Sequence, residues 1–282
     1  MTETLDFAET EKILDDVKIP SAPTVLMEVH EILQRDEPEI ADIAEVISKD
    51  LGMSALVMRT LNSPFFGLRR KIDSIQQATT LLGLNNIGNI VAGLALRRAM
   101  EESDGPNPDN FWDSPMNVAL VSAQLAKRLG GVAADEAYLL GLFMNCGEAI
   151  LISRFPESRE LKKQAYYDGV VQTRLEDEKL NTNHAIVGFL MARKWGINSS
   201  ITDIILRHHE AIEFLNDNQI NPFRKRLIAI IKCAEYIDNR FWGRSQYAEW
   251  NEISSAILSY LELQSDDFDD ILEDMQDLLM NT

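Results

Sequence analysis

Ala137-Tyr-Leu-Leu-Gly-Leu-Phe-Met-Asn-Cys-Gly-Glu-Ala-Ile-Leu151 is the most informative segment of this chain. Its apolar pattern is helical, and we expect one helix over residues 134–153. Met144 and Asn145 stand in the middle of it. A hard or borderline divalent cation prefers imidazole nitrogen and carboxylate oxygen, whereas Met144 offers a soft thioether and Asn145 a neutral amide. The segment therefore predicts an apolar helix whose central pair is a poor metal ligand.

Helical periodicity also dominates the rest of the chain, and no convincing alternating strand pattern interrupts it. Only short loops separate the predicted helices after residue 110, which favours antiparallel packing of neighbours. We therefore predict an all-α fold built as a multi-helix bundle. The other expected helices cover residues 25–33, 38–47, 53–61, 75–82, 87–100, 111–129, 157–167, 181–195, 198–211, 222–240, 249–262 and 266–279.

One polar segment divides this helical pattern. Residues 102–110, Glu-Ser-Asp-Gly-Pro-Asn-Pro-Asp-Asn, contain two prolines and a glycine and form the clearest linker. We predict an N-terminal helical subdomain over residues 1–104, which packs on a larger helical bundle over residues 105–282.

The composition indicates a globular protein that does not bind nucleic acid or membranes. Of the 282 residues, 45% are hydrophobic and 26% are charged, which is the usual balance for a soluble fold. The formal net charge of −18 speaks against nucleic acid as a partner, because phosphate contacts need Lys and Arg. No apolar run approaches the roughly 18 residues of a membrane span.

The start of the chain and its cysteines predict a cytoplasmic location. Residues 1–17 are rich in Asp and Glu and lack the basic start of a secretory signal. Cys146 and Cys233 both lie in apolar helical stretches, as reduced and buried thiols would.

Much of the acidic charge lies in the last predicted helix, Ser265-Asp-Asp-Phe-Asp-Asp-Ile-Leu-Glu-Asp-Met-Gln-Asp-Leu-Leu279. Phe268, Ile271 and Leu272 begin an apolar stripe at helical spacing. The stripe favours a helix that docks on the protein by one apolar edge. The alternative is an acidic segment that docks on a partner.

Several segments resemble a known family. Residues 137–151 resemble the central helix of the HD phosphohydrolase superfamily, where a GLLHDIGK-like motif carries a metal-binding His-Asp pair. The first half of the chain resembles HDOD domains, which are bacterial signal-transduction modules related to HD and HD-GYP domains. The HDOD-like segments are Ile19-Pro-Ser-Ala-Pro-Thr-Val-Leu26, Ile43-Ala-Glu-Val-Ile-Ser-Lys-Asp-Leu-Gly-Met53, Leu61-Asn-Ser-Pro-Phe-Phe-Gly-Leu68 and Ile75-Gln-Gln-Ala-Thr-Thr-Leu-Leu-Gly-Leu84. The resemblance covers roughly residues 15–240 and implies an HD-like helical bundle.

At several positions where metal-active relatives carry ligands, this chain carries other residues. Ser114 stands at the place of the first histidine, and Met144-Asn145 replaces the His-Asp pair. Glu148 replaces a lysine that often follows the pair, and the Gly-Tyr-Pro triplet associated with cyclic-di-GMP hydrolysis in HD-GYP domains is missing. The resemblance therefore implies a degenerate site without catalytic residues.

Residual metal-ligand candidates remain at His184, His208, His209 and Glu235. Three ligands could in principle hold a zinc ion with an open position. Adjacent residues of a helix point about 100° apart, so we do not expect His208 and His209 to face one site together. We therefore expect no metal and no other cofactor, and we interpret His184 and one neighbour as hydrogen-bonded interior histidines.

The resemblance implies a catalytically inactive HDOD-type signal-transduction or regulatory protein, which acts by binding a signalling protein partner or a small ligand. A ligand is expected in a pocket around Asn145, His184, His208 and Glu235. The alternative is a divergent, phosphodiesterase-like metal-dependent phosphohydrolase that uses the remaining histidines with Glu235 and Glu148. A third interpretation, a nucleic-acid-binding regulator, would need a basic face against the overall charge.

Overall fold

A computed structural model describes residues 20–63, 66, 68, 70–101, 112–244 and 248–280. The regular elements of these ranges are helices, without any strand, which confirms the predicted all-α fold. The predicted linker at 102–110 lies outside the described residues, so the division between residues 104 and 105 stays a prediction.

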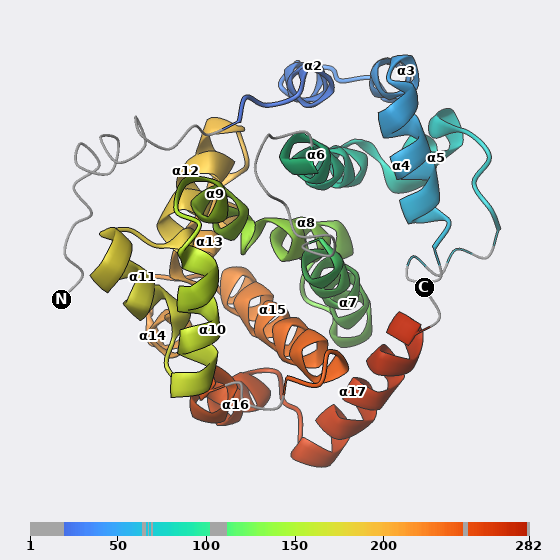
Figure 1. The fold of residues 1–282 in the computed structure, drawn as a ribbon. Coiled ribbons are helices and arrows are strands. Elements are labelled where there is room, and N and C mark those ends of the chain that lie inside the picture. The colour runs from blue at the N-terminus through green and yellow to red at the C-terminus, as the bar shows by residue number, and fades with distance from the viewer. Residues whose placement is uncertain are drawn as a thin grey trace.

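The helices are short to medium in length and follow one another through brief connections (Figure 1). Their bounds are α2 (Thr24–Leu33), α3 (Ile40–Lys49), α4 (Leu51–Leu61), α5 (Ile75–Leu82), α6 (Leu84–Glu101), α7 (Asp113–Leu129), α8 (Ala134–Phe143), α9 (Cys146–Arg154), α10 (Ser158–Asp168), α11 (Gln172–Leu180), α12 (His184–Lys194), α13 (Ser199–Arg207), α14 (Ala211–Asn216), α15 (Pro222–Phe241), α16 (Ala248–Tyr260) and α17 (Ser265–Met280).

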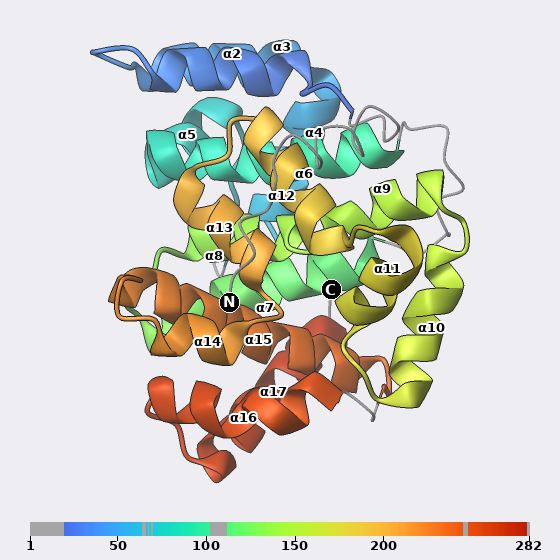
Figure 2. The same cartoon turned by 90° about the vertical axis from the view of Figure 1, so that its left-hand side faces the viewer.

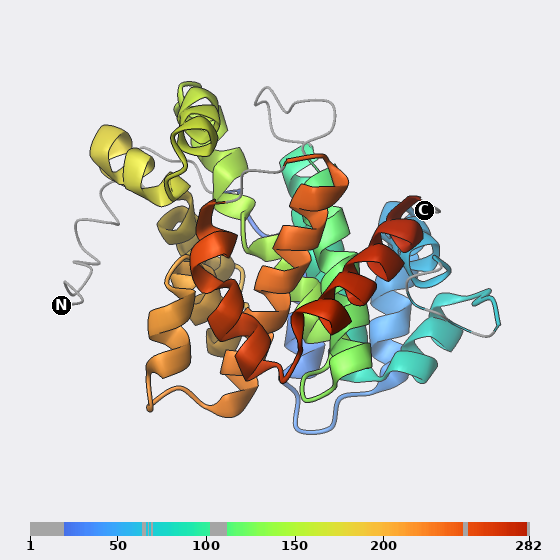
Figure 3. The same cartoon turned by 90° about the horizontal axis from the view of Figure 1, so that it is seen from below.

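Helices α7, α8 and α15 form the centre of the molecule. α7 packs against both α8 and α15, and α6 packs against α8 and joins it to α2, α4 and α5. α2 and α3 lie at one end and α16 and α17 at the opposite end (Figure 2). α10 and α11 lie on the side opposite to α3, α4 and α5 (Figure 3). The site described below lies where the central helices meet α9 to α12.

The predicted helix over 134–153 is in fact two helices, and this corrects the sequence interpretation. α8 ends at Phe143, Met144 and Asn145 form a turn, and α9 begins at Cys146. Asn145 stands at the N-cap position of α9, but its side chain makes no capping hydrogen bond. The apolar pattern runs through this turn without a gap, so periodicity alone could not reveal the break.

The segment Ala134–Arg154, which contains α8 and α9, is as hydrophobic as a membrane-spanning helix. Its most apolar window of 18 residues has a mean hydropathy of 1.2, enough by length and composition for a membrane span. This window corrects the prediction that no apolar run approaches the length of a membrane span. Because 78% of that window is buried inside the protein, its apolar character is accounted for by its place in the core.

Side-chain caps fix where several helices begin. Asn183 caps α12 and Asn198 caps α13, each by accepting a hydrogen bond from the backbone N–H three residues further on. The cap at Asn183 makes His184 the first residue of α12. α13 ends at Arg207, not at residue 211 as predicted, so His208 and His209 lie in the turn that follows it. α11 and α14 were not predicted.

The acidic C-terminal helix docks on the protein by its apolar edge, as the stripe predicted. Phe268, Ile271 and Leu272 are buried on α17, which packs against α15. On its polar side, Asp274 accepts a hydrogen bond of 2.6 Å from Arg128 of α7. Exposed ion pairs of this kind contribute little stability, so the apolar edge holds the helix in place.

Candidate functional site

A cavity of about 670 Å³ opens beside the turn between α8 and α9. Its volume falls within the range of roughly 300–1,000 Å³ that is typical of small-molecule sites. The cavity is lined by seven of the eight site residues that the sequence analysis named: Ser114, Met144, Asn145, Glu148, His184, His209 and Glu235. The eighth, His208, does not line it. The structure therefore brings together positions that lie more than a hundred residues apart in the chain.

The positions where metal-active relatives carry other residues line the cavity without forming a metal-binding group; they are Ser114, Met144, Asn145 and Glu148. Met144 is 1% exposed and packs in the core. Asn145 keeps its side-chain oxygen buried, with no hydrogen-bond partner among the described residues. Glu148 accepts a hydrogen bond of 2.6 Å from Lys162, and the Ser114 hydroxyl donates to Asp238. These contacts already occupy the carboxylate and the hydroxyl.

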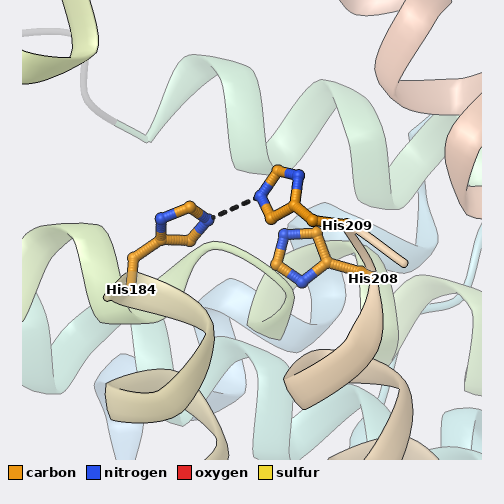
Figure 4. Close-up of side chains that lie close together, drawn as sticks. All are labelled: His184, His208 and His209. Atoms are coloured by element: carbon orange, nitrogen blue, oxygen red, sulfur yellow. Dashed lines mark hydrogen bonds between the residues drawn. The ribbon is translucent and has the colours of Figure 1, made fainter. Parts of the chain in front are cut away.

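The three histidines form one cluster, which corrects the expectation that His208 and His209 cannot face one site (Figure 4). One nitrogen of each ring lies within 4.8 Å of the others. The expectation assumed a continuous helix, but α13 ends at Arg207 and the following turn directs both rings the same way. The ring centroids of His208 and His209 are 4.0 Å apart.

The Nδ1 atom of each ring contacts an acceptor. His184 Nδ1 lies 2.6 Å from Glu176, and His209 Nδ1 lies 2.9 Å from Glu249. His208 Nδ1 lies 2.7 Å from the backbone oxygen of Ile205. Carboxylate and carbonyl oxygens only accept hydrogen bonds, so this network assigns a hydrogen to Nδ1 of all three rings.

The Nε2 atoms of the three rings face one another. Those of His184 and His209 are 2.9 Å apart, and that of His208 is buried without a hydrogen-bond partner among the described residues. In Figure 4 a ring nitrogen of His208 lies on the side that faces the contact between the other two rings. A hydrogen bond between two Nε2 atoms needs a hydrogen on one of them and a lone pair on the other.

The carboxylate beside His184 favours the protonated form of that ring. Burial alone lowers the pKa of His184, but the Glu176 carboxylate and its hydrogen bond raise that pKa above its usual value. Burial alone raises the pKa of Glu176, but His184 lowers it below the usual range. His208 is fully buried beside His209 and Lys232, and burial followed by these charges lowers its pKa well below the ordinary value. His208 is therefore neutral at pH 7.

A fully buried lysine continues this network. Lys232 donates to Glu235 at 2.9 Å and lies 2.6 Å from Glu249. Burial lowers the pKa of Lys232, but the carboxylates of Glu235 and Glu249 raise it overall, so the ammonium stays charged. Glu235 is one of the residual metal-ligand candidates of the sequence analysis. It lines the cavity, and its carboxylate is paired with Lys232.

One face of α10 forms an outer wall of the cavity. Arg159, Lys162, Lys163, Tyr166 and Tyr167 all line it and recur three or four residues apart, which places them on one side of a helix. Tyr167 is 76% exposed and Lys162 is half-exposed, so the wall is open to solvent. This wall brings positive charge to the cavity of a protein whose net charge is −18.

Sequence reasoning missed this wall and the partners of the histidines. The basic residues of α10 carried a signal, because their spacing of three and four is visible in the chain. Glu176, Glu249 and Asp238 carried none: they follow no fixed spacing from His184, His209 or Ser114. The tertiary fold alone makes them neighbours.

The chain folds as an all-α protein with a cavity at the α8–α9 turn. A model of the HDOD domain matches residues 19–211, more than half of the chain, and the chain therefore belongs to the HDOD domain family. This confirms the resemblance found in the sequence.

Two curated relatives match the chain at sequence level. An uncharacterised protein of Treponema pallidum (strain Nichols) is 23% identical over 255 residues, which are 90% of this chain and 47% of the relative. The uncharacterised protein YuxH of Bacillus subtilis (strain 168) is 44% identical over 55 residues, 20% of this chain and 13% of the relative. The chain thus spans at most about half the length of these relatives.

Solved structures share the fold at identities too low to carry function. An HDOD domain protein of Geobacter sulfurreducens has a TM-score of 0.65 at 22% identity, covering 90% of this chain and 95% of the other. A candidate phosphohydrolase of Shewanella amazonensis has a TM-score of 0.68 at 22% identity, covering 95% and 96%. A candidate signal-transduction protein of Marinobacter aquaeolei has a TM-score of 0.65 at 19% identity, covering 95% and 60%.

Proposed function

We propose that this chain is a catalytically inactive HDOD regulatory module. It binds a small anionic ligand in the cavity, and ligand binding changes its interaction with a signalling protein partner. One observation carries this proposal. The cavity remains open at the α8–α9 turn, although Met144 and Asn145 have replaced the His-Asp pair there. A cavity of this volume that is lined by Met144 and Asn145 at the dyad position is suited to binding without catalysis.

The charge on the cavity wall supports an anionic ligand. Arg159 and Lys163 of α10 line the cavity together with Arg244, which follows α15. Lys162 is paired with Glu148, and ligand binding would have to compete with that ion pair. Arginine and lysine bind phosphate and carboxylate groups by charge-assisted hydrogen bonds, and the rings of Tyr166 and Tyr167 offer apolar contact beside them.

The cavity lacks the groups that hydrolysis would need at the dyad position. Metal-assisted hydrolysis requires a cation that polarises the phosphate and lowers the pKa of a bound water. Methionine and asparagine at 144 and 145 supply neither imidazole nor carboxylate, and Glu148 is held by Lys162. We therefore expect binding without turnover.

Calorimetric titration with inorganic phosphate, GMP and cyclic di-GMP tests the proposal on the chelator-treated protein. We expect at least one of these anions to bind, and the variant Arg159→Ala/Lys163→Ala to weaken that binding at least tenfold. Arg174→Ala is the matched control, because Arg174 is an exposed base on the neighbouring helix α11 and does not line the cavity. Absence of binding by all three anions, or equal loss in the control, would contradict an anion-binding cavity.

A second function is favoured by the histidine cluster. A divergent metal-dependent phosphohydrolase could use His184, His208 and His209 as its cation ligands. Hydrolysis of bis-p-nitrophenyl phosphate in the presence of Mn²⁺ or Zn²⁺ separates the two functions. Turnover that His184→Ala abolishes would establish the enzyme, whereas the regulatory proposal expects no turnover above the rate without protein.

A further inference from the structure

We propose that α10 is a movable lid over the cavity, held closed by a latch, the ion pair between Lys162 of α10 and Glu148 of α9. The outer wall of the cavity, from Arg159 to Val171, belongs to α10 and the turn after it. Movement of this one helix therefore opens or closes the cavity while the central helices α7, α8 and α15 stay in place. The role of the lid in ligand binding rests on the proposed anion-binding function, whereas the movement of α10 does not.

The packing of α10 is that of a segment that can move separately from the core. The helix lies at the edge of the molecule, where it packs mainly against α9 and α11 (Figure 2). Three of its eleven residues are buried, namely Ser158, Leu161 and Ala165. Leu161 and Ala165 lie outside the contiguous hydrophobic core. Segments with few buried apolar contacts open at the lowest free energy, and ligand-binding lids are drawn from them.

Both ends of α10 have the features of a hinge. Gly169 follows the helix with a φ of 64°, in the left-handed region that glycine adopts without strain. Phe155 leaves the helical region at the end of α9, with a φ of −126° and a ψ of 84°. Hinges are usually a few residues at the ends of elements, where they absorb changes in φ and ψ. Rotations at Phe155 and Gly169 would move α10 as a rigid body.

The latch ties α10 to the helix beneath it. The Lys162 ammonium lies 2.6 Å from the Glu148 carboxylate, and the two side chains are 49% and 7% exposed. The neighbouring Lys163 is paired instead with Glu160, which belongs to α10 itself. The pair of Lys162 must therefore break when α10 moves away from α9, whereas the pair of Lys163 moves with the helix.

The latch also couples the position of α10 to an anion in the cavity. Lys162 and Glu148 both line the cavity. A lysine ammonium binds carboxylate and phosphate by the same charge-assisted hydrogen bonds, so Glu148 and an anionic ligand compete for Lys162. A ligand shifts an equilibrium toward the conformation that it binds more tightly. An anion that takes Lys162 from Glu148 thus favours the released position of α10.

Hydrogen exchange of the full, ligand-free chain, followed by mass spectrometry, tests the lid. Lys162→Met removes the ammonium group and keeps most of the apolar stem, and methionine has a helix propensity similar to that of lysine. We expect the backbone amides of α10 to exchange at least tenfold faster in this variant, with no change in α7, α8 or α15. Lys163→Met is the matched control and should leave the exchange of α10 unchanged, because Lys163 pairs within its own helix.

Equal exchange of α10 in the wild type and Lys162→Met, or equal acceleration in both variants, would overturn the latch. Acceleration that spreads to α8 and α15 would show a loss of global stability and no lid. The wild-type protein gives a second measurement that needs no variant. Relative to their intrinsic rates, its α10 amides should exchange at least a hundredfold faster than those of α8, and equal protection of the two helices would contradict a separate movement of α10.

Spin labels distinguish movement of an intact helix from local unfolding. We place them at Gln164→Cys on α10 and Glu28→Cys on α2, two exposed positions that do not line the cavity; the native Cys146 and Cys233 are buried. We expect Lys162→Met to add a second, longer distance between the labels. An unchanged distance distribution in that variant would overturn the lid.

Inorganic phosphate separates failure of the lid from failure of the proposed function. Saturating phosphate should shift the labelled wild-type protein toward the same longer distance. Phosphate that binds in calorimetry and leaves the distance unchanged would overturn the coupling to Lys162. Absence of phosphate binding would count against the anion-binding cavity, and the ligand-free comparison of Lys162→Met with Lys163→Met would still decide the lid.

Discussion

The Nε2 atoms of His184 and His209 lie 2.9 Å apart, and each ring also contacts a buried carboxylate through its other nitrogen. The result is an unbroken row of hydrogen bonds from Glu176 through both rings to Glu249. Its members come from α11, α12, the turn after α13, and α16.

Removing the charge at one end of the row should destabilise the fold. Glu176 is 1% exposed and lies 2.6 Å from the equally buried His184. Breaking a buried pair on one side typically costs 3–5 kcal/mol, because the remaining charge is left without compensation. We expect Glu176→Gln to lower the free energy of unfolding by about 3 kcal/mol, measured by urea denaturation of the metal-free protein.

Glu178→Gln is the control for this change. Glu178 lies on the same helix, and its exposed carboxylate is 3.5 Å from Arg174. Exposed pairs of this kind contribute between about 0 and 1 kcal/mol. If Glu178→Gln cost as much as Glu176→Gln, the loss would reflect the helix and not the buried pair.

The stability of the metal-free protein should depend on pH in a window set by His184. Burial lowers the pKa of His184, but the Glu176 carboxylate and its hydrogen bond outweigh burial and raise that pKa above its ordinary value of 6.5. Its contribution is therefore complete below pH 6.5 and is lost as the pH rises through the folded-state pKa. His208 has a lowered pKa, so its contribution is complete above pH 6.5 and is lost as the pH falls.

Urea denaturation at a series of pH values checks these two signs. Between about pH 6.5 and 8.5 the free energy of unfolding should fall, and Glu176→Gln should flatten that fall. A range below pH 8.5 avoids Cys146, whose pKa burial raises to about 12. A free energy that rises over this window in the wild-type protein would show that His184 is not held in its charged form.

The fold was predictable where helices have a regular apolar pattern, and the site was not. The apolar spacing around Phe268 and Ile271 marked a docked helix, and α17 docks by those residues. The turn at Asn145 was hidden because apolar residues continue on both sides of it. The end of α13 at Arg207 has no Gly or Pro signal in the sequence, and this end is what allows both following histidines to face one point.

The contact between α9 and α12 should tolerate no added methyl group. A Cβ atom at Gly147 would lie 2.0 Å from the backbone oxygen of His184 and 2.7 Å from the backbone nitrogen of Gly188. Backbone atoms cannot rotate away, so the two helices would have to separate. Overpacking of a core typically costs 1–3 kcal/mol, and we expect Gly147→Ala to reach about 3 kcal/mol in thermal and urea denaturation.

Gly88→Ala is the matched change on α6. Its Cβ would lie 2.8 Å from the end of the Leu33 side chain, which can turn away. Alanine also has a helix propensity about 1 kcal/mol better than glycine, so the net change should stay within about 1 kcal/mol of zero. A comparable loss at both positions would refute the close approach of α9 and α12 as the cause.

Restoring the dyad should not restore catalysis. The double variant Met144→His/Asn145→Asp supplies the missing pair, but Ser114 still offers no imidazole and Glu148 remains held by Lys162. We expect no hydrolysis of bis-p-nitrophenyl phosphate above the wild-type level in the presence of Mn²⁺. Turnover that is lost again when His184→Ala is added would show that the site is degenerate only at the dyad.

The row of bonds from Glu176 to Glu249 also has a consequence for how this protein can change. Apolar packing depends mainly on volume, so one aliphatic side chain can often replace another. Hydrogen bonds depend on direction as well as distance, and this row joins segments far apart in the chain. A substitution in α11, α12 or α16 must therefore preserve the angle at which each helix presents its polar group, a stricter condition than filling space.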